Sequence, residues 1–283
     1  MGHHPHWLKR PAPSGDTLKG IEKLLADLNL STVCRSAQCP NIGECFNRGT
    51  ATFMILGNRC TRNCRFCAVE HGAVFSPPDP DEPENVVRAA KHLRLTHMVV
   101  TSVTRDDLAD GGAGQFIKTI EAFKRELPGS TIEILTPDFQ GDMSVVAAVC
   151  KAGPDVYNHN VETVPRLYPS IRPQAVYQRS LDVLKTAAAS GLRVKSGLML
   201  GLGETAEELA SVFKDLAACG CSILTMGQYL APSSRHAPVV RYIPPEEFDR
   251  LGEIARLEGF KEVFSGPFVR SSYRAEEIYR HEK

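Results

Sequence analysis

Long apolar runs are missing from this sequence of 283 residues, and none approaches the ~18 residues that a membrane-spanning helix needs. An excess of charge of one sign is missing too, since 33 Lys and Arg residues balance 33 Asp and Glu residues. A formal charge of zero argues against a broad basic surface for nucleic acid and against a polybasic membrane patch. We therefore expect partners that are neither nucleic acid nor membrane.

Targeting signals are also missing from the first eleven residues. Met1–Pro11 has neither the apolar core of a secretory signal nor the Arg- and Ser-rich amphipathic pattern of a transit peptide. Its His3, His4 and His6 are more typical of a loose polar tail than of a metal site. We therefore predict a cytoplasmic protein whose thiols stay reduced, which turns attention to metal and redox roles for cysteine.

Cysteine is abundant and unevenly distributed, because six of the nine lie between positions 34 and 67. Three thiolates are an incomplete set for structural zinc, which needs four ligands, but they suit a four-iron cluster that leaves one iron free for another ligand. Zinc sites that pool the six cysteines are the alternative. The six form two groups: Cys34, Cys39 and Cys45, named here the N-terminal triad, and Cys60, Cys64 and Cys67, named here the loop triad.

The other three cysteines have a different setting. Cys150 follows the apolar stretch Val145–Val149, and Cys219 follows Leu216–Ala218. Burial as small apolar residues therefore explains Cys150, Cys219 and Cys221 better than metal ligation does.

Apolar, β-branched runs alternate with helix-like segments along the chain. Short links and uniform composition favour one curved parallel sheet with right-handed crossovers, although the length alone would allow two domains. A partial barrel of six β–α pairs and a doubly wound open sheet both fit. We predict strands over Thr52–Leu56, His97–Val103, Thr131–Leu135, Asp155–Val161, Val194–Leu200 and Ser222–Tyr229, and helices over Glu84–Arg94, Gly114–Leu127, Ser144–Ala152, Val176–Ser190, Ala206–Ala218 and Pro245–Leu257.

Either architecture places functional residues at the carboxyl ends of the strands. The loop triad directly follows the first predicted strand, so we expect it at this rim. Thr101 and Ser102 stand at the end of the second strand, Asn160–Glu162 at the end of the fourth and Gly201–Glu204 after the fifth. The N-terminal triad precedes the first strand and belongs to an extension that folds over one rim.

The loop Cys60–Cys67 has an aromatic residue just before its last cysteine and resembles the cluster-binding loop of the radical S-adenosylmethionine superfamily. Further motifs narrow the resemblance to the lipoyl synthase family and extend it over nearly the whole chain. Paired triads together with an Arg-Ser-Ser-Tyr ending are highly specific for that family. The motifs are Cys34–Cys45, Thr101–Gly112, Asn158–Glu162 and Arg270–Tyr273.

The resemblance implies an α/β fold, a (β/α)6 partial TIM barrel with N-terminal and C-terminal extensions. The extensions would cover residues 1–50 and 259–283, and the barrel residues 51–258. The implied cofactors are S-adenosylmethionine and two [4Fe–4S] clusters. The loop triad would hold the cluster that cleaves S-adenosylmethionine to a radical. The N-terminal triad would hold an auxiliary cluster whose fourth ligand is Ser272, although the sequence alone does not rank it above Ser271.

The implied activity is that of a sulfurtransferase. Hydrogen abstraction at C6 and C8 of a protein-bound octanoyl-lysine is followed each time by sulfur transfer from the auxiliary cluster, giving lipoyl-lysine. The implied partners are an octanoylated lipoyl carrier, such as 2-oxoacid dehydrogenase E2 or glycine cleavage H protein, an electron donor such as ferredoxin or flavodoxin, and a carrier that repairs the spent cluster. Neither the particular carrier nor the oligomeric state follows from the sequence.

Other residues at the rim are candidates for contacts with S-adenosylmethionine. Given the resemblance, Asn160 and Glu162 are expected to hydrogen-bond ribose hydroxyls. Thr101 and Ser102 are candidates to receive the methionine amino group, with ordinary polar residues at a strand end as the alternative. Lys195 lies in an otherwise buried strand, which suggests either an anionic partner such as the methionine carboxylate or a snorkelling side chain.

Charged residues near the motifs have further roles to test. Arg270 stands beside Ser272, where it would offset cluster charge. Asp106, Asp107 and Asp110 are typical of a solvated turn rather than of a metal site.

Two other classes of protein stay open. One is another two-cluster enzyme such as a tRNA methylthiotransferase, which should carry an RNA-binding domain and basic charge that this sequence lacks. The other is a non-catalytic zinc module that uses its cysteines for folding. The metal taken up on anaerobic reconstitution separates iron–sulfur enzymes from zinc modules.

Overall fold

A computed structural model describes residues 5–9, 16–37, 39–47, 52–73, 75–273 and 275–280. His3 and His4 of the N-terminal segment lie outside these residues, whereas His6 begins the short 3-10 helix η1 (His6–Leu8).

One eight-stranded sheet forms the centre of the molecule, and its strands follow each other in chain order. A doubly wound sheet would reverse its strand order at a switch point, so the partial barrel is the correct alternative. All pairs are parallel except the first, in which β1 runs antiparallel to β2. The strands are β1 (Ser31–Thr32), β2 (Thr52–Ile55), β5 (His97–Ser102), β6 (Thr131–Leu135), β7 (Val156–Asn158), β8 (Arg193–Leu200), β9 (Ile223–Gln228) and β10 (Glu262–Ser265).

The six predicted strands are confirmed, but the sheet continues beyond them. β10 pairs in parallel with β9 and adds a seventh parallel strand. It lies past residue 258, where the sequence suggested that the C-terminal extension begins. Within the described strands β1 and β10 are the two edges, and the barrel stays open between them.

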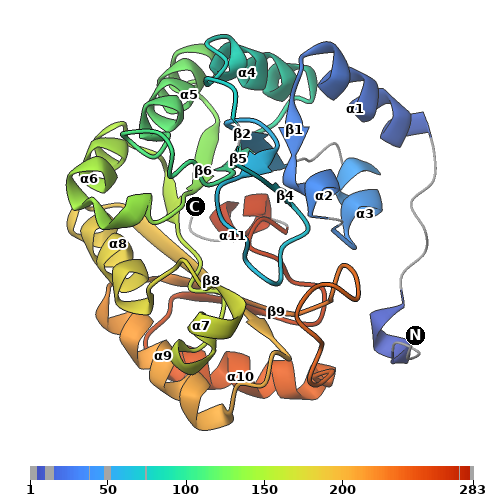
Figure 1. Cartoon of the computed structure of the whole chain (residues 1–283), viewed down its shortest axis with the longest axis vertical. Helices are drawn as coiled ribbons and strands as arrows, with labels where there is room; N and C mark the ends of the chain where they lie inside the picture. The colour runs from blue at the N-terminus through green and yellow to red at the C-terminus, as the bar shows by residue number, and fades with distance from the viewer. Residues whose placement is uncertain are drawn as a thin grey trace.

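Helices surround this curved sheet on its outer face (Figure 1). Right-handed crossovers place each helix between consecutive parallel strands, which explains the ring of helices. Thr205 and Glu208 form a capping box at the start of one of them, α9. The ring consists of α4 (Glu82–His92), α5 (Ala113–Glu126), α6 (Met143–Lys151), α8 (Tyr177–Ala189), α9 (Ala206–Ala218) and α10 (Pro245–Leu257), with the short elements η3 (Pro165–Leu167) and α7 (Tyr168–Ile171) between β7 and α8 and η2 (Phe139–Gly141) after β6.

The extensions occupy two different places. The N-terminal helices stand on the side of the ring where β1 lies, whereas the C-terminal helix α11 (Ala275–Arg280) lies inside the ring and packs against β5 (Figure 1). No helix in the described part of the chain has both the length and the apolar character of a membrane span. The N-terminal helices are α1 (Asp16–Asp27), α2 (Val33–Ser36) and α3 (Ile42–Asn47).

The two faces of each strand have different neighbours. In β2, Thr52 and Met54 line a cavity inside the ring, whereas Phe53 and Ile55 do not line it and belong to the apolar core, to which Met54 also contributes. Successive side chains of a strand point to opposite faces, so this alternation divides the sheet into a core side and a cavity side. Most residues of the strands are therefore buried, although only one face of the sheet packs against helices.

Gly227 in β9 lets the C-terminal segment cross the sheet closely. A Cβ atom at Gly227 would lie 2.0 Å from the carbonyl oxygen of Val269 and 3.0 Å from Nη1 of Arg270. Backbone cannot give way as a flexible side chain can, so any larger residue must push the segment after β10 away from the sheet.

We expect Gly227→Ala to lower the free energy of unfolding by about 1–3 kcal/mol, since overpacking displaces backbone. Urea denaturation measures this. Gly129→Ala is the matched control, because nothing lies within 4 Å of a Cβ atom there; its stability should stay within about 0.5 kcal/mol of the wild type. Equal losses in both variants would contradict this account.

Candidate functional site

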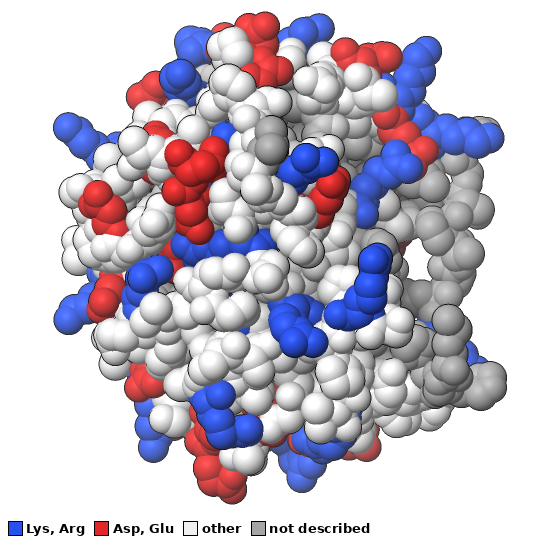
Figure 2. All heavy atoms as spheres, in the orientation of Figure 1, with Lys and Arg blue, Asp and Glu red and all other residues white. Residues whose placement is uncertain are grey.

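Both cysteine triads face one cavity of about 540 Å³ inside the ring. The cavity also collects residues from strand ends and from the C-terminal segment. Figure 2 shows the face of the molecule that is seen in Figure 1, on which acidic and basic side chains are interspersed rather than separated by sign. The predicted site residues that line the cavity are the six triad cysteines, Thr101, Ser102, Asn160, Glu162, Arg270 and Ser272.

The loop triad is held by a small ribbon, in which β3 (Arg59–Cys60) pairs with β4 (Glu70–His71). Within the loop, the backbone N–H of Cys67 donates to the carbonyl of Cys64 at 3.1 Å. Burial raises the pKa of the Cys64 thiol and raises that of Cys67 to about 12. These thiols therefore keep their protons until a cationic metal replaces them.

The N-terminal triad comes from α2, α3 and the turn between them. The N–H of Cys39 donates to the carbonyl of Cys34 at 3.0 Å, and that of Cys45 to the carbonyl of Asn41 at 3.0 Å. Burial raises the pKa of Cys34 to about 11. This triad is therefore a second set of buried and partly buried thiols on the same cavity.

The arrangement of the donors bears on which metal the triads suit. Across the described ranges, no three His, Cys, Asp or Glu side chains converge on a point where one metal ion would sit. A structural zinc site gathers four ligands round a single ion. A four-iron cube is wider than one ion and takes thiolates, so the donor set fits a cluster.

Two hydrogen bonds among the described residues attach the C-terminal segment to residues that stand between the cysteines of the N-terminal triad. Asn41 Nδ2 donates to the carbonyl of Phe268 at 2.7 Å, and Tyr273 Oη donates to Glu44 Oε1 at 2.8 Å. Asn41 is almost fully buried. These contacts bring the Arg-Ser-Ser-Tyr motif over the cysteines although the two segments are more than 220 residues apart in the chain.

The two serines of that motif are used differently. Ser271 Oγ accepts a hydrogen bond from Asn160 Nδ2 at 2.6 Å. Ser272 also lines the cavity, and its hydroxyl forms no hydrogen bond with the residues that the structure describes. Arg270 Nη1 donates to the carbonyl of Val269 at 2.7 Å.

Comparison with known proteins agrees with this geometry. The model of the radical SAM superfamily matches residues 54–216. A lipoyl synthase of Oleidesulfovibrio alaskensis is 53% identical over 96% of this chain and 93% of its own length. One from Caldanaerobacter subterraneus subsp. tengcongensis is 56% identical, with 96% of this chain and 95% of that protein covered. The chain belongs to the lipoyl synthase family.

The fold of the radical SAM superfamily is recovered in structure as well. Methylornithine synthase aligns with a TM-score of 0.52 at 14% identity, covering 88% of this chain and 84% of its own. Membership of the superfamily implies a [4Fe–4S] cluster and S-adenosylmethionine as cofactors. The chain therefore belongs to neither of the two alternative classes, the zinc modules and the tRNA methylthiotransferases.

Several strand-end groups suit the cofactor of this family. Ser102 Oγ and Asn160 Oδ1 are buried and without a hydrogen-bond partner among the described residues, and both residues line the cavity. Glu162 has a positive φ of 65° and accepts from Asn160 Nδ2 at 3.2 Å. Burial raises the pKa of Glu162. Thr101 Oγ1 donates to the carbonyl of Leu135 at 2.9 Å, so its proton is already used.

Lys195 has a different anionic partner from the one expected. Its Nζ lies 2.9 Å and 3.0 Å from the two carboxylate oxygens of Glu133, and both residues are buried. Lys195 is not among the residues that line the cavity. A buried charge needs a partner, and Glu133 on β6 meets that need without a ligand.

Arg172 is a site residue that the sequence analysis missed. It follows α7, lines the cavity and donates through Nη1 to the carbonyls of Asn160 and Val161 at 3.1 and 3.0 Å. Its Nε is buried without a partner in the described part of the chain. No motif marks Arg172, and the only available signal was its place shortly after Asn160–Glu162.

The three aspartates after β5 form turn and ion-pair contacts, of which only the turn was predicted. Asp106 pairs with Arg62, and Asp107 pairs with Arg105. Asp110 accepts from the backbone N–H groups of Gly112 and Gly114 at the start of α5. Their carboxylates are therefore engaged without a metal ion.

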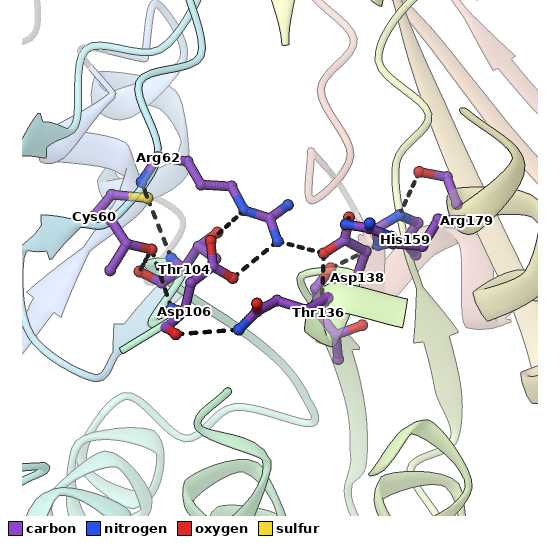
Figure 3. Close-up of polar contacts among 11 residues, drawn as sticks. Cys60, Arg62, Thr104, Asp106, Thr136, Asp138, His159 and Arg179 are labelled. Atoms are coloured by element: carbon purple, nitrogen blue, oxygen red, sulfur yellow. Dashed lines mark hydrogen bonds and ion pairs between the residues drawn. The ribbon is translucent and has the colours of Figure 1, made fainter. Parts of the chain in front are cut away.

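His159 is a buried histidine with a partner for each of its ring nitrogens. Its Nδ1 donates to the carbonyl of Thr136 at 2.9 Å, and Nε2 lies 3.0 Å from Ser180 Oγ (Figure 3 shows the residue). Burial lowers the pKa of His159 to about 4, with the Arg172 charge acting in the same direction. The imidazole is therefore neutral in the folded protein at neutral pH.

This neutrality predicts a pH dependence. The folded-state pKa of His159 lies below the unfolded value of ~6.5. The contribution of the neutral imidazole to the free energy of unfolding is therefore complete above pH ~6.5 and is lost as the pH falls towards 4. We expect this loss to reach the order of 3 kcal/mol. Urea denaturation at several pH values measures it, and His159→Gln should flatten the curve. Parallel curves for the two proteins would contradict the assignment.

Proposed function

We propose that this chain inserts two sulfur atoms, at C6 and C8, into the octanoyl chain of an octanoyl-lysine on a carrier protein, giving lipoyl-lysine. One observation carries the proposal: two cysteine triads and Ser272, whose hydroxyl is unpartnered among the described residues, line a single cavity at the carboxyl ends of the strands. Relatives named lipoyl synthase at 53% and 56% identity over nearly the whole chain support it. The proposed compartment is the cytoplasm.

The loop triad would hold one [4Fe–4S] cluster through three thiolates, which leaves an iron open for S-adenosylmethionine. When bound, the cluster and S-adenosylmethionine supply radical chemistry that acid–base side chains cannot provide for an unactivated C–H bond. The role of the chain is to hold the reacting groups together and to exclude water. The position of the cavity on the inner side of the curved sheet suits that role.

Four residues would position S-adenosylmethionine. The Arg172 guanidinium, rather than Lys195, would receive the methionine carboxylate, since its Nε is buried and unpartnered among the described residues. Ser102 would accept from the methionine amino group. Asn160 and Glu162 would hydrogen-bond ribose hydroxyls, which would give the orphaned Asn160 Oδ1 a partner.

The N-terminal triad would hold the auxiliary cluster, with Ser272 as the fourth ligand. Ser272 is favoured over Ser271 because the hydroxyl of Ser271 is already bonded to Asn160. The Asn41–Phe268 and Glu44–Tyr273 hydrogen bonds would position the serine. Arg270 would offset the negative charge of the ligand set. An oxygen ligand is harder than a thiolate and suits an iron that leaves when the cluster gives up sulfur.

Two further partners belong to this proposal. A low-potential electron carrier such as ferredoxin or flavodoxin would reduce the first cluster, and a cluster carrier would rebuild the second. The extension of residues 1–50 and the tail of residues 259–283 would together form the auxiliary site, although β10 within that tail is part of the sheet.

Anaerobic reconstitution tests the two-cluster assignment. We expect roughly eight irons per chain, and a product with two added sulfur atoms after incubation with S-adenosylmethionine, reductant and an octanoyl-lysine peptide. Replacing Cys34, Cys39 and Cys45 together by Ala should halve the iron and abolish sulfur addition, while S-adenosylmethionine cleavage continues. Cys219→Ala, outside the cavity lining, is the control. Sulfur addition by the triple variant would refute the proposal.

The ligand serine has its own test. Ser272→Cys should keep an auxiliary cluster with an altered Mössbauer spectrum but lower the yield of lipoyl product, because thiolate holds the departing iron more tightly than an alkoxide oxygen. Ser271→Cys is the matched control and should leave the auxiliary-cluster spectrum unchanged. Wild-type yield from Ser272→Cys, or a changed spectrum in the control alone, would show that the other serine is the ligand.

A further inference from the structure

The Cys60 sulfur receives two backbone hydrogen bonds from different parts of the chain. The N–H of Arg62 lies 3.4 Å from Sγ, and the N–H of Thr104 lies 3.3 Å from it. The first donor belongs to the same loop. The second belongs to the segment after β5, so it reaches the sulfur only when that segment is docked against the cysteine loop.

Backbone and hydroxyl groups make part of this docking. Both the N–H and Oγ1 of Thr61 donate to the carbonyl of Thr104 at 3.0 Å. Thr61 Oγ1 in turn accepts from the N–H of Asp106 at 3.1 Å. The cysteine loop and the segment after β5 are thus joined next to the sulfur.

The Arg62 side chain provides the other contacts between the cysteine loop and the segment after β5. It is only 6% exposed and donates to both carboxylate oxygens of Asp106, through Nε at 2.7 Å and Nη2 at 2.9 Å. Nη2 also donates to Asp138 Oδ1 at 2.6 Å (Figure 3). Asp138 follows β6, so one guanidinium fastens the loops after two strands to the cysteine loop.

The charges of this group are balanced. Asp138 is fully buried, and Arg179 Nη1 lies 3.4 Å from its second oxygen. Two carboxylates and two guanidinium groups therefore neutralise each other. Arg62 holds the pKa of Asp138 down at about 2, so that carboxylate stays ionised at neutral pH. A planar guanidinium makes three such contacts in one plane, which a lysine ammonium cannot reproduce.

We propose that Arg62 is a positioning residue for the cluster of the loop triad: by binding Asp106 and Asp138, it fixes two N–H donors on the Cys60 sulfur and thereby raises the reduction potential of that cluster. Hydrogen bonds to cluster sulfurs stabilise the more negative reduced state. The inference rests on the cluster implied by the superfamily. It does not depend on sulfur insertion or on an auxiliary cluster.

Arg62→Lys tests it in the full-length reconstituted protein. The readout is an EPR-monitored redox titration of the signal that changes when S-adenosylmethionine is added, which identifies the open-iron cluster. We expect the ratio of reduced to oxidised cluster at a fixed potential to fall about tenfold, a shift of about 59 mV to more negative potential for a one-electron couple. Arg65→Lys, an exposed arginine of the same loop, is the matched control and should keep the wild-type potential.

A second variant keeps the proposal testable if Arg62→Lys does not bind an iron–sulfur cluster. Thr61→Val leaves every charge in place but removes the hydroxyl that donates to the carbonyl of Thr104 and accepts from the N–H of Asp106, so it should shift the potential in the same direction by a smaller amount. A wild-type potential in Arg62→Lys, or in Thr61→Val if only that variant loads, overturns the proposal, whatever happens to stability or lipoyl yield. Failure of both variants to bind the cluster also overturns it, because Arg62 would then build the loop rather than tune it.

Discussion

Parallel pairing of the strands is the constraint on which the site depends. Met54, Thr101, Leu135 and Asn158 are successive pairing partners across β2, β5, β6 and β7. They stand at one level of the sheet, so the loops that follow them leave from one rim. A shift of one residue between any two of these strands would turn cavity-lining side chains towards the helices. The cysteine loop, the Asp106 segment and the Asn160 segment would then no longer meet.

Local patterns in the sequence were enough to predict most of this framework. The six strands and their helices appear in the pattern of β-branched runs and amphipathic segments, and the cysteine spacing marks both triads. β10 was missed because Glu262–Ser265 is four residues long and carries a charge and a serine at its ends. Its place in the sheet is fixed by pairing with β9. Chain order of the strands, which decides between a barrel and a doubly wound sheet, is likewise a property of the folded chain.

Side-chain partners were predicted less well than elements, because they depend on contacts between distant segments. The sequence showed that Lys195 needs an anion but not that Glu133 supplies it from a strand two places away. Arg172 carries no motif, and only the fold brings it to the cavity. The proposed preference for Ser272 over Ser271 rests on the position of Asn160. In each case the relevant contact is long-range and absent from any local pattern.

The bond between Tyr273 and Glu44 has a consequence for biosynthesis. The N-terminal triad meets the Arg-Ser-Ser-Tyr segment across 229 positions of the chain. During synthesis the early residues leave the ribosome well before the late ones. The contact between Glu44 and Tyr273 therefore forms only after the whole stretch between them has been made, whereas the three cysteines of the loop triad lie within eight positions of each other. The side of the cavity that joins the two ends of residues 44–273 is thus completed later than the cysteine loop.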